Sequence, residues 1–112
     1  MKKVEAMIRP ERLEAVMEEL RRLGYSGVTI TEVKGHGKQK GMTHMWRGAE
    51  YRVEFLPKIK IEAVVLDEDL GKVTSALIRA ARTDSIGDGK IFIYDVADAV
   101  RIRTGESGFN AI

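Results

Sequence analysis

The sequence has no cysteine, only two prolines and no long run of apolar residues. The absence of cysteine excludes disulfide scaffolds, thiolate zinc sites and cysteine nucleophiles. No apolar stretch approaches the ~20 residues that a transmembrane helix needs, and the first residues lack the apolar segment of a signal peptide. We therefore expect a cytoplasmic protein.

The chain also has little net charge, because nineteen Lys and Arg face seventeen Asp and Glu, which leaves +2. Such a small excess cannot hold a polyanion by bulk charge, so any anion site must be local. With 112 residues, of which 44% are hydrophobic, the chain can bury one core of ordinary size. Residues 1–112 are therefore expected to form a single domain.

Several catalytic motifs are missing. No Gly-Lys pair is followed by Ser or Thr, which excludes a P-loop nucleotide hydrolase. The two histidines, His36 and His44, lie in no zinc motif, and no serine lies in a nucleophile-elbow context. Nothing in these residues argues for covalent catalysis, and we expect no catalytic residues.

The apolar pattern predicts an alternation of strands and helices. Period-two alternation indicates strands over residues 2–8 and 59–65, and a segment rich in Val, Ile and Thr indicates another over 28–33. A helix should run from Pro10 to Gly24, and a second should start at Asp67, whose carboxylate is expected to cap the first amides. Two further strands are expected over 91–94 and 100–103.

This order, β-α-β twice followed by a short final strand, is typical of an α+β protein with the ferredoxin-like split β-α-β arrangement. Such a fold has an antiparallel sheet with two helices on one face. Residues from about 105 onward are predicted to form a flexible C-terminal tail.

The segment between the second and third strands, residues 34–57, is too long for a simple hairpin. Counted to residue 60, it carries seven basic residues against two glutamates, together with the large rings of Trp46 and Tyr51. A flexible solvated loop explains the charges, whereas the rings favour a surface for a partner protein. If both arms extend as a ribbon, about twelve residues per arm could reach roughly 40 Å.

A second unusual segment, Thr83 to Lys90, contains Gly-Asp-Gly-Lys and is followed by Arg101 and Arg103. Glycines let backbone amides approach an anion, and the three cations can neutralise phosphate oxygens. Because Asp-Gly also makes ordinary hairpin turns, a plain turn remains an alternative.

Three stretches together, residues 31–41, 46–51 and 83–93 with 101–105, closely resemble the PII nitrogen-regulatory signal proteins, and the likeness runs from Met1 to about Glu106. The resemblance implies a homotrimer with three nucleotide sites between subunits. The long loop, at about 36–55, would be the family's T-loop. The chain departs from the usual family residues at His36, Lys38 and Trp46, and Lys38 keeps the charge of the frequent Arg without its planar fork.

The resemblance also implies site residues, position by position. The ATP or ADP site would contain Thr29, Gly37, Lys38, Gln39, Val64, Gly87, Asp88, Gly89, Lys90, Arg101, Ile102 and Arg103. 2-Oxoglutarate would bind at Gln39, Lys40, Gly41 and Lys58, joined through a Mg²⁺ ion that the ATP phosphates and Gln39 hold. Tyr51 would be the loop tyrosine open to nucleotidylylation.

The function implied by the resemblance is nitrogen, carbon and energy signalling without catalysis. Candidate partners are an ammonium transporter, a glutamine synthetase adenylyltransferase, a sensor histidine kinase and N-acetylglutamate kinase. Nucleic acid is not expected, and membrane association is expected only through a transporter. The alternatives are an RNA-binding module, which the missing aromatic signature in the strands argues against, and a small transferase, for which no base and nucleophile are assembled.

Overall fold

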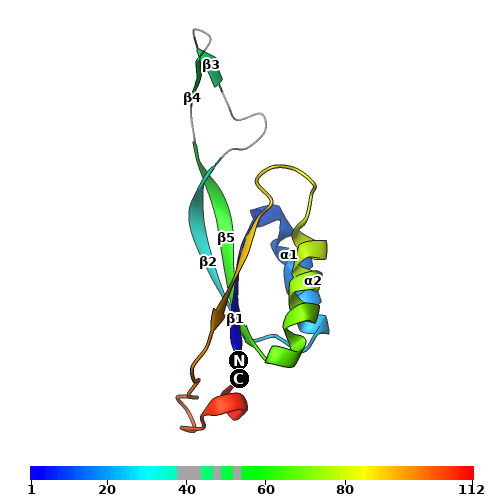
Figure 1. Cartoon of the computed structure of the whole chain (residues 1–112), viewed down its shortest axis with the longest axis vertical. Coiled ribbons are helices and arrows are strands. Elements are labelled where there is room, and N and C mark those ends of the chain that lie inside the picture. The colour runs from blue at the N-terminus through cyan, green and yellow to red at the C-terminus, as the bar shows by residue number, and fades with distance from the viewer. Residues whose placement is uncertain (38–43, 47–48, 52–53) are drawn as a thin grey trace.

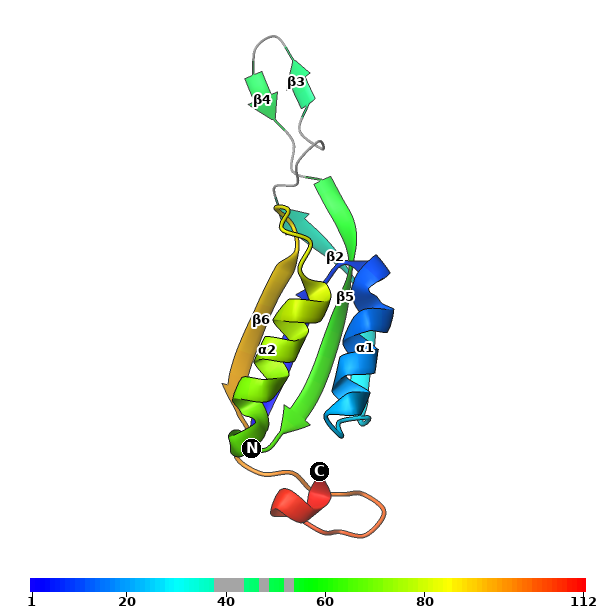
Figure 2. The same ribbon diagram turned by 90° about the vertical axis from the view of Figure 1, so that its right-hand side faces the viewer.

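The computed structural model describes residues 1–37, 44–46, 49–51 and 54–112, with side chains described for 1–36 and 55–112. Four strands, β1 (Lys2–Ile8), β2 (Val28–Gly37), β5 (Glu54–Val65) and β6 (Gly89–Asp95), form one sheet in the order β2-β5-β1-β6. Every pairing in this sheet is antiparallel (Figure 1). The helices α1 (Leu13–Arg22) and α2 (Leu70–Ala81) lie side by side on one face (Figure 2). The predicted ferredoxin-like arrangement is thus confirmed.

The core lies between the helices and this face of the sheet. Alternate residues of β1 and β5 point toward the helices, which present Val16, Leu20, Val73 and Leu77 to them. Fully burying such a side chain contributes roughly 1.5–3 kcal/mol. The buried strand residues are Val4, Ala6, Ile8, Ile59, Ile61, Ala63 and Val65.

No helix covers the opposite face of the sheet in the described part of the chain (Figure 1). Phe92 and Tyr94 of β6 keep 45% of their surface exposed there. The ammonium group of Lys3 lies 4.7 Å from the centre of the Tyr94 ring and 3.3 Å from the Glu62 carboxylate. This face therefore combines exposed aromatic rings with paired charges, a composition suited to another protein surface.

Both helices are preceded by short 3-10 turns, η1 (Pro10–Arg12) and η2 (Asp67–Asp69). Gly24 ends the first helical segment with a φ of +89°, as predicted. The predicted cap at Asp67 is wrong, because its carboxylate accepts a hydrogen bond from the Met1 ammonium group at 2.9 Å instead. A charged donor is a stronger partner than a backbone amide. No helix described here is long and apolar enough to cross a membrane.

The strands β2 and β5 are longer than predicted and continue together beyond the sheet. Their pairing extends to Gly37 opposite Glu54, so the arms of the predicted loop begin as a two-stranded ribbon. A second, short antiparallel pair is formed by β3 (His44–Trp46) and β4 (Ala49–Tyr51). The predicted start of the loop at residue 34 is therefore too early.

The predicted strand over 100–103 is also wrong. Val100 forms only an isolated bridge with Ser107, because the chain turns back on itself between them. The Gly105 amide donates to the Arg101 carbonyl at 2.8 Å, and Gly105 has a φ of +73°. Residues Gly108–Ala111 then form the 3-10 turn η3. The mobility of this tail stays a prediction.

Candidate anion-binding site

The turn between α2 and β6 is closed by the side chain of Asp88. Its carboxylate accepts hydrogen bonds from the Thr83 amide at 2.7 Å, the Asp84 amide at 3.0 Å and the Thr83 hydroxyl. Burial raises the pKa of the Asp88 carboxyl, but these bonds and the Arg9 guanidinium outweigh it and hold the pKa well below its ordinary value. Asp88 is therefore an ionised group that organises residues 83–88.

Two glycines give this turn its shape. Gly87 and Gly89 have φ values of +100° and +111°, which side chains rarely tolerate. A Cβ atom on Gly89 would lie 1.7 Å from the Met7 carbonyl oxygen, so β6 approaches β1 too closely for any other residue. Among the described residues, the Gly87 amide has no hydrogen-bond acceptor. It is thus available to a ligand.

Two lysines lie beside the turn. The Lys58 ammonium group donates to the Gly87 carbonyl at 2.5 Å. Burial, followed by the nearby charge of Arg9, lowers the pKa of Lys58, while Glu11 and Asp88 oppose the shift. Lys58 and Lys90 line a pocket of about 440 Å³ together with Gly35, His36, Gly87 and Gly89. Two cations and glycine backbone around one cavity suit a phosphate group.

A residue that the sequence analysis missed, Arg9, supports this turn from the end of β1. Its Nε atom lies 3.0 Å from the Asp88 carboxylate, and its Nη2 atom donates to the Ile86 carbonyl at 2.9 Å. The Arg9 side chain is only 13% exposed. Its position before Pro10 indicates a strand end but no partner, so the sequence pattern holds no signal for this contact.

The predicted nucleotide residues lie toward two ends of the sheet. Gly89 pairs with Ile8 at one end of β6, and Asp95 pairs with Lys2 at the other. The six residue steps between them correspond to about 20 Å. Arg101, Ile102 and Arg103 follow the far end of β6, so one chain does not bring them to Lys90. Ile102 is 99% exposed, and the Arg101 guanidinium lies 3.5 Å from the Glu106 carboxylate.

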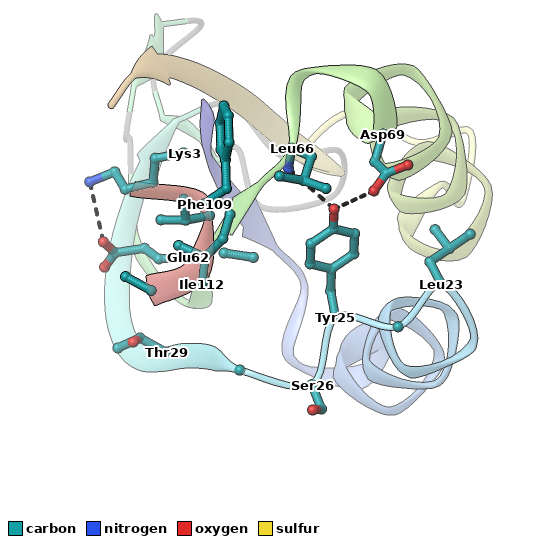
Figure 3. Close-up of a pocket in the computed structure, with 15 residues that line it drawn as sticks. Lys3, Leu23, Tyr25, Ser26, Thr29, Glu62, Leu66, Asp69, Phe109 and Ile112 are labelled. Atoms are coloured by element: carbon teal, nitrogen blue, oxygen red, sulfur yellow. Dashed lines mark hydrogen bonds and ion pairs between the residues drawn. The ribbon is translucent and has the colours of Figure 1, made fainter. Parts of the chain in front are cut away.

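A second pocket, of about 770 Å³, lies toward the end of the sheet away from the turn (Figure 3). Thr29 and Val64 line it, as do Tyr25, Phe109 and Ile112. The contribution of the tail was not anticipated from the sequence, because Phe109 follows a segment rich in glycine and polar residues.

Tyr25 fixes one wall of this second pocket. Its hydroxyl donates to the Asp69 carboxylate and accepts a bond from the Leu66 amide at 3.2 Å (Figure 3). Burial, with the hydrogen bond to Asp69, raises the pKa of the Tyr25 phenol. The contacts connect the segment after α1 with the start of α2.

Four predicted ligand residues, Lys38, Gln39, Lys40 and Gly41, lie outside the described residues, as does the side chain of Tyr51 at the end of β4. Gly37 is described as the last residue of β2. In the part of the chain with described side chains, no cluster of three His, Asp or Glu residues could hold a metal ion. The predicted Mg²⁺ contact at Gln39 therefore stays a prediction.

Comparison with known proteins identifies the family of this chain. The model of the family described as "Nitrogen regulatory protein P-II" matches residues 1–106. The chain is 57% identical to Nitrogen regulatory protein P-II of Haemophilus influenzae over 112 residues, which cover the whole of both chains. The chain belongs to the P-II family. It is also 54% identical, again over both whole chains, to Nitrogen regulatory protein P-II of Rhizobium meliloti and Nitrogen regulatory protein P-II 1 of Escherichia coli K12.

Membership makes this P-II protein a regulatory signalling protein of nitrogen metabolism, a family whose members regulate partner proteins. The family expectation from the sequence is thereby confirmed. The alternative of an RNA-binding module has no support from these comparisons, since the matched family covers nearly the whole chain.

Proposed function

We propose that this P-II protein senses adenylate nucleotides and 2-oxoglutarate and passes their state to partner proteins through its T-loop. The observation that carries this proposal is the convergence of Lys58, Lys90, Gly87 and Gly89 on one pocket at the base of the β2–β5 ribbon. A ligand in this pocket touches both the glycine turn and the strand that leads into the T-loop. Binding there can therefore bias the loop.

The pocket suits the phosphates of ATP or ADP. Lys90 offers a cation, Gly87 offers a backbone amide, and Lys58 can exchange the Gly87 carbonyl for a more negative partner. Charge-assisted hydrogen bonds of this kind contribute on the order of 1.5–3 kcal/mol each. Asp88 contributes through its effect on the turn, because its carboxylate oxygens already accept bonds from Thr83, Asp84 and Arg9.

A complete nucleotide site would require a second copy of the chain. Val64, Arg101 and Arg103 lie toward the far end of the sheet from Lys90, and Thr29 lies on β2, the opposite edge strand, so a neighbouring subunit would supply them. The uncovered face of the sheet, with Phe92 and Tyr94, is available for such an assembly. We therefore include a homotrimer in the proposal, with the nucleotide sites between subunits.

2-Oxoglutarate would join the site through Mg²⁺. The residues fit this chemistry, because the amide oxygen of Gln39 is a hard ligand of the kind that Mg²⁺ prefers, and Lys58 can pair with a carboxylate. When bound, the metal would link ATP phosphates to a 2-oxo acid. Gln39 follows Gly37, the last residue of β2, so its engagement would act at the root of the T-loop. ADP lacks the γ-phosphate for the same arrangement.

The proposed action is non-enzymatic regulation in the cytoplasm. Candidate partners are an ammonium transporter, a glutamine synthetase adenylyltransferase, a sensor histidine kinase and N-acetylglutamate kinase, with membrane contact only through a transporter and no nucleic acid. Tyr51 would accept a nucleotidyl group where a modifying enzyme exists. A pull-down with the purified protein, with and without ATP and 2-oxoglutarate, tests these partners: the recovered partner should change with the effectors.

Calorimetric titration with Mg-ATP tests the proposal itself. Wild type should bind one ATP per chain, and Lys90→Ala should weaken binding about tenfold because one charge-assisted contact is lost. Lys72→Ala, an exposed position on α2 outside the pocket, is the matched control and should leave binding unchanged. Absence of ATP binding by the folded wild type would contradict the proposal.

A further inference from the structure

Arg9 stands outside the pocket yet contacts the turn that forms one of its walls. It is not among the pocket-lining residues, and its two hydrogen bonds go to Ile86 and Asp88, on either side of Gly87. We propose that Arg9 is a positioning residue of the anion-binding turn, holding residues 86–88 in the shape that accepts phosphate. This inference rests on the proposed function, since it requires that a nucleotide phosphate binds at Gly87.

The geometry gives Arg9 and Lys58 complementary tasks. Arg9 binds the Ile86 carbonyl and the Asp88 carboxylate, and Lys58 binds the Gly87 carbonyl between them. Each of the three residues 86–88 thus has an oxygen atom that accepts a hydrogen bond from a cationic side chain, either Lys58 of β5 or Arg9 after the end of β1. The Ile86 carbonyl and the Asp88 carboxylate, held by Arg9, cannot turn toward an incoming phosphate, where they would repel it.

The second contribution of Arg9 is electrostatic. The Asp88 carboxylate is a partly buried anion, 23% exposed, directly beside the glycines that line the pocket. Arg9 is its cationic partner at 3.0 Å. Without that partner, the negative charge would oppose any phosphate at Gly87, and low exposure would weaken screening by solvent. Loss of Arg9 should therefore weaken anion binding beyond any effect on folding.

A variant series separates these effects from a purely structural role. Mg-ATP affinity is measured by calorimetry, and stability by urea unfolding, for Arg9→Gln, Arg9→Lys and the double variant Arg9→Gln/Asp88→Asn. Arg21→Gln, on the exposed surface of α1, is the control for loss of an arginine. We expect Arg9→Gln to bind Mg-ATP about tenfold more weakly than wild type, Arg9→Lys to lose less, and the control to be unchanged.

The change in Mg-ATP affinity from Arg9→Gln to the double variant distinguishes the two explanations. If the uncompensated Asp88 charge opposes phosphate, Arg9→Gln/Asp88→Asn should bind Mg-ATP more tightly than Arg9→Gln alone. If Arg9 acted only on folding stability and not on the charge at the turn, the double variant would bind no more tightly than Arg9→Gln, because two lost contacts damage the turn more than one. Additive losses, or wild-type affinity in folded Arg9→Gln, would overturn the inference. If Arg9→Gln does not fold, wild-type affinity in Arg9→Lys overturns it. Absence of ATP binding in wild type would instead refute the proposed function.

Discussion

At the scale of single residues, Asp88 shows that a residue of a predicted ligand motif also holds the local backbone in shape. Its place in Gly-Asp-Gly is visible in the sequence, but its partners Thr83, Asp84 and Arg9 are not, because Arg9 lies 79 positions earlier in the chain. Residue type and spacing could predict that glycines and cations gather near residue 88. They could not predict which oxygen atoms the fold already uses.

The depressed pKa of Asp88 predicts a pH-dependent contribution to stability. Because the folded pKa lies below the unfolded value of about 3.9, the contribution is fully present above that value and is lost as pH falls through the folded pKa. Asp88→Asn should lower the free energy of unfolding by about 1–3 kcal/mol at pH 7. The deficit relative to wild type should shrink below about pH 4.

Urea unfolding of both proteins at pH 7 and pH 3 measures this. Asp84→Asn is the matched control, because its side chain is 86% exposed and asparagine accepts the left-handed backbone of that position. A deficit of equal size at both pH values would contradict the role assigned to the Asp88 carboxylate.

Gly89 gives a steric prediction at the same scale. Gly89→Ala places a Cβ atom 1.7 Å from the Met7 carbonyl oxygen at a φ of +111°, so the start of β6 must shift. We expect destabilisation of about 2 kcal/mol or more from strain. Gly71→Ala, in α2 with no neighbouring atom within 4 Å, should instead stabilise by roughly 0.5–1 kcal/mol. Thermal unfolding that shifts equally in both variants would refute the steric account.

At the scale of elements, periodicity predicts much of the fold because burial on one face imposes it. β1 was predicted at its observed bounds, and both helices lie where their apolar stripes place them. The errors have physical causes. Pairing between β2 and β5 continues as a ribbon without a core, so no alternation marks Gly37 or Glu54 as ends. The segment 100–103 alternates like a strand but finds no neighbouring strand to pair with in the described residues.

The contact between the segment after α1 and the start of α2 depends on Tyr25. Tyr25→Phe removes the hydroxyl that donates to Asp69 and accepts from the Leu66 amide, so we expect a loss of about 1–2 kcal/mol in unfolding free energy. Tyr94→Phe is the matched control, since no described contact uses its hydroxyl as donor or acceptor. Equal stability of Tyr25→Phe and wild type in urea would contradict this account.

At the scale of the whole molecule, the account requires that subunits share each nucleotide site. Light scattering should give three times the chain mass of 12.5 kDa, and a monomer mass at micromolar concentration would contradict the trimer.

The variants Lys90→Ala and Arg101→Ala should each weaken ATP binding when every subunit of the trimer carries the same substitution. When trimers form from an equal mixture of the two variants by co-refolding, about a quarter of the sites should combine an intact Lys90 from one subunit with an intact Arg101 from its neighbour. These sites should recover ATP binding. A site within one chain predicts no recovery.

The proposed sharing of the site between subunits would explain why the structure of one chain leaves the predicted nucleotide residues in two groups. Sequence likeness to the PII family could suggest that Thr29, Lys90 and Arg101 serve one ligand. β6 runs from Gly89 to Asp95, and its length separates Lys90 from Arg101 within the chain. The periodicity of apolar residues cannot predict a site shared between subunits, because it predicts helices and strands of one chain and carries no information about a neighbouring copy.

The central claim, a sensor in which 2-oxoglutarate depends on Mg-ATP, is tested most directly by titrating 2-oxoglutarate calorimetrically with Mg-ATP, with ADP and with neither. We predict appreciable binding only with Mg-ATP, and a reciprocal tightening of ATP that corresponds to a coupling of about 1–3 kcal/mol. Gln39→Ala and Lys58→Ala should each abolish or strongly weaken the binding, whereas Lys72→Ala should not. Equal affinity in all three nucleotide conditions, or no loss in either site variant, would contradict the account.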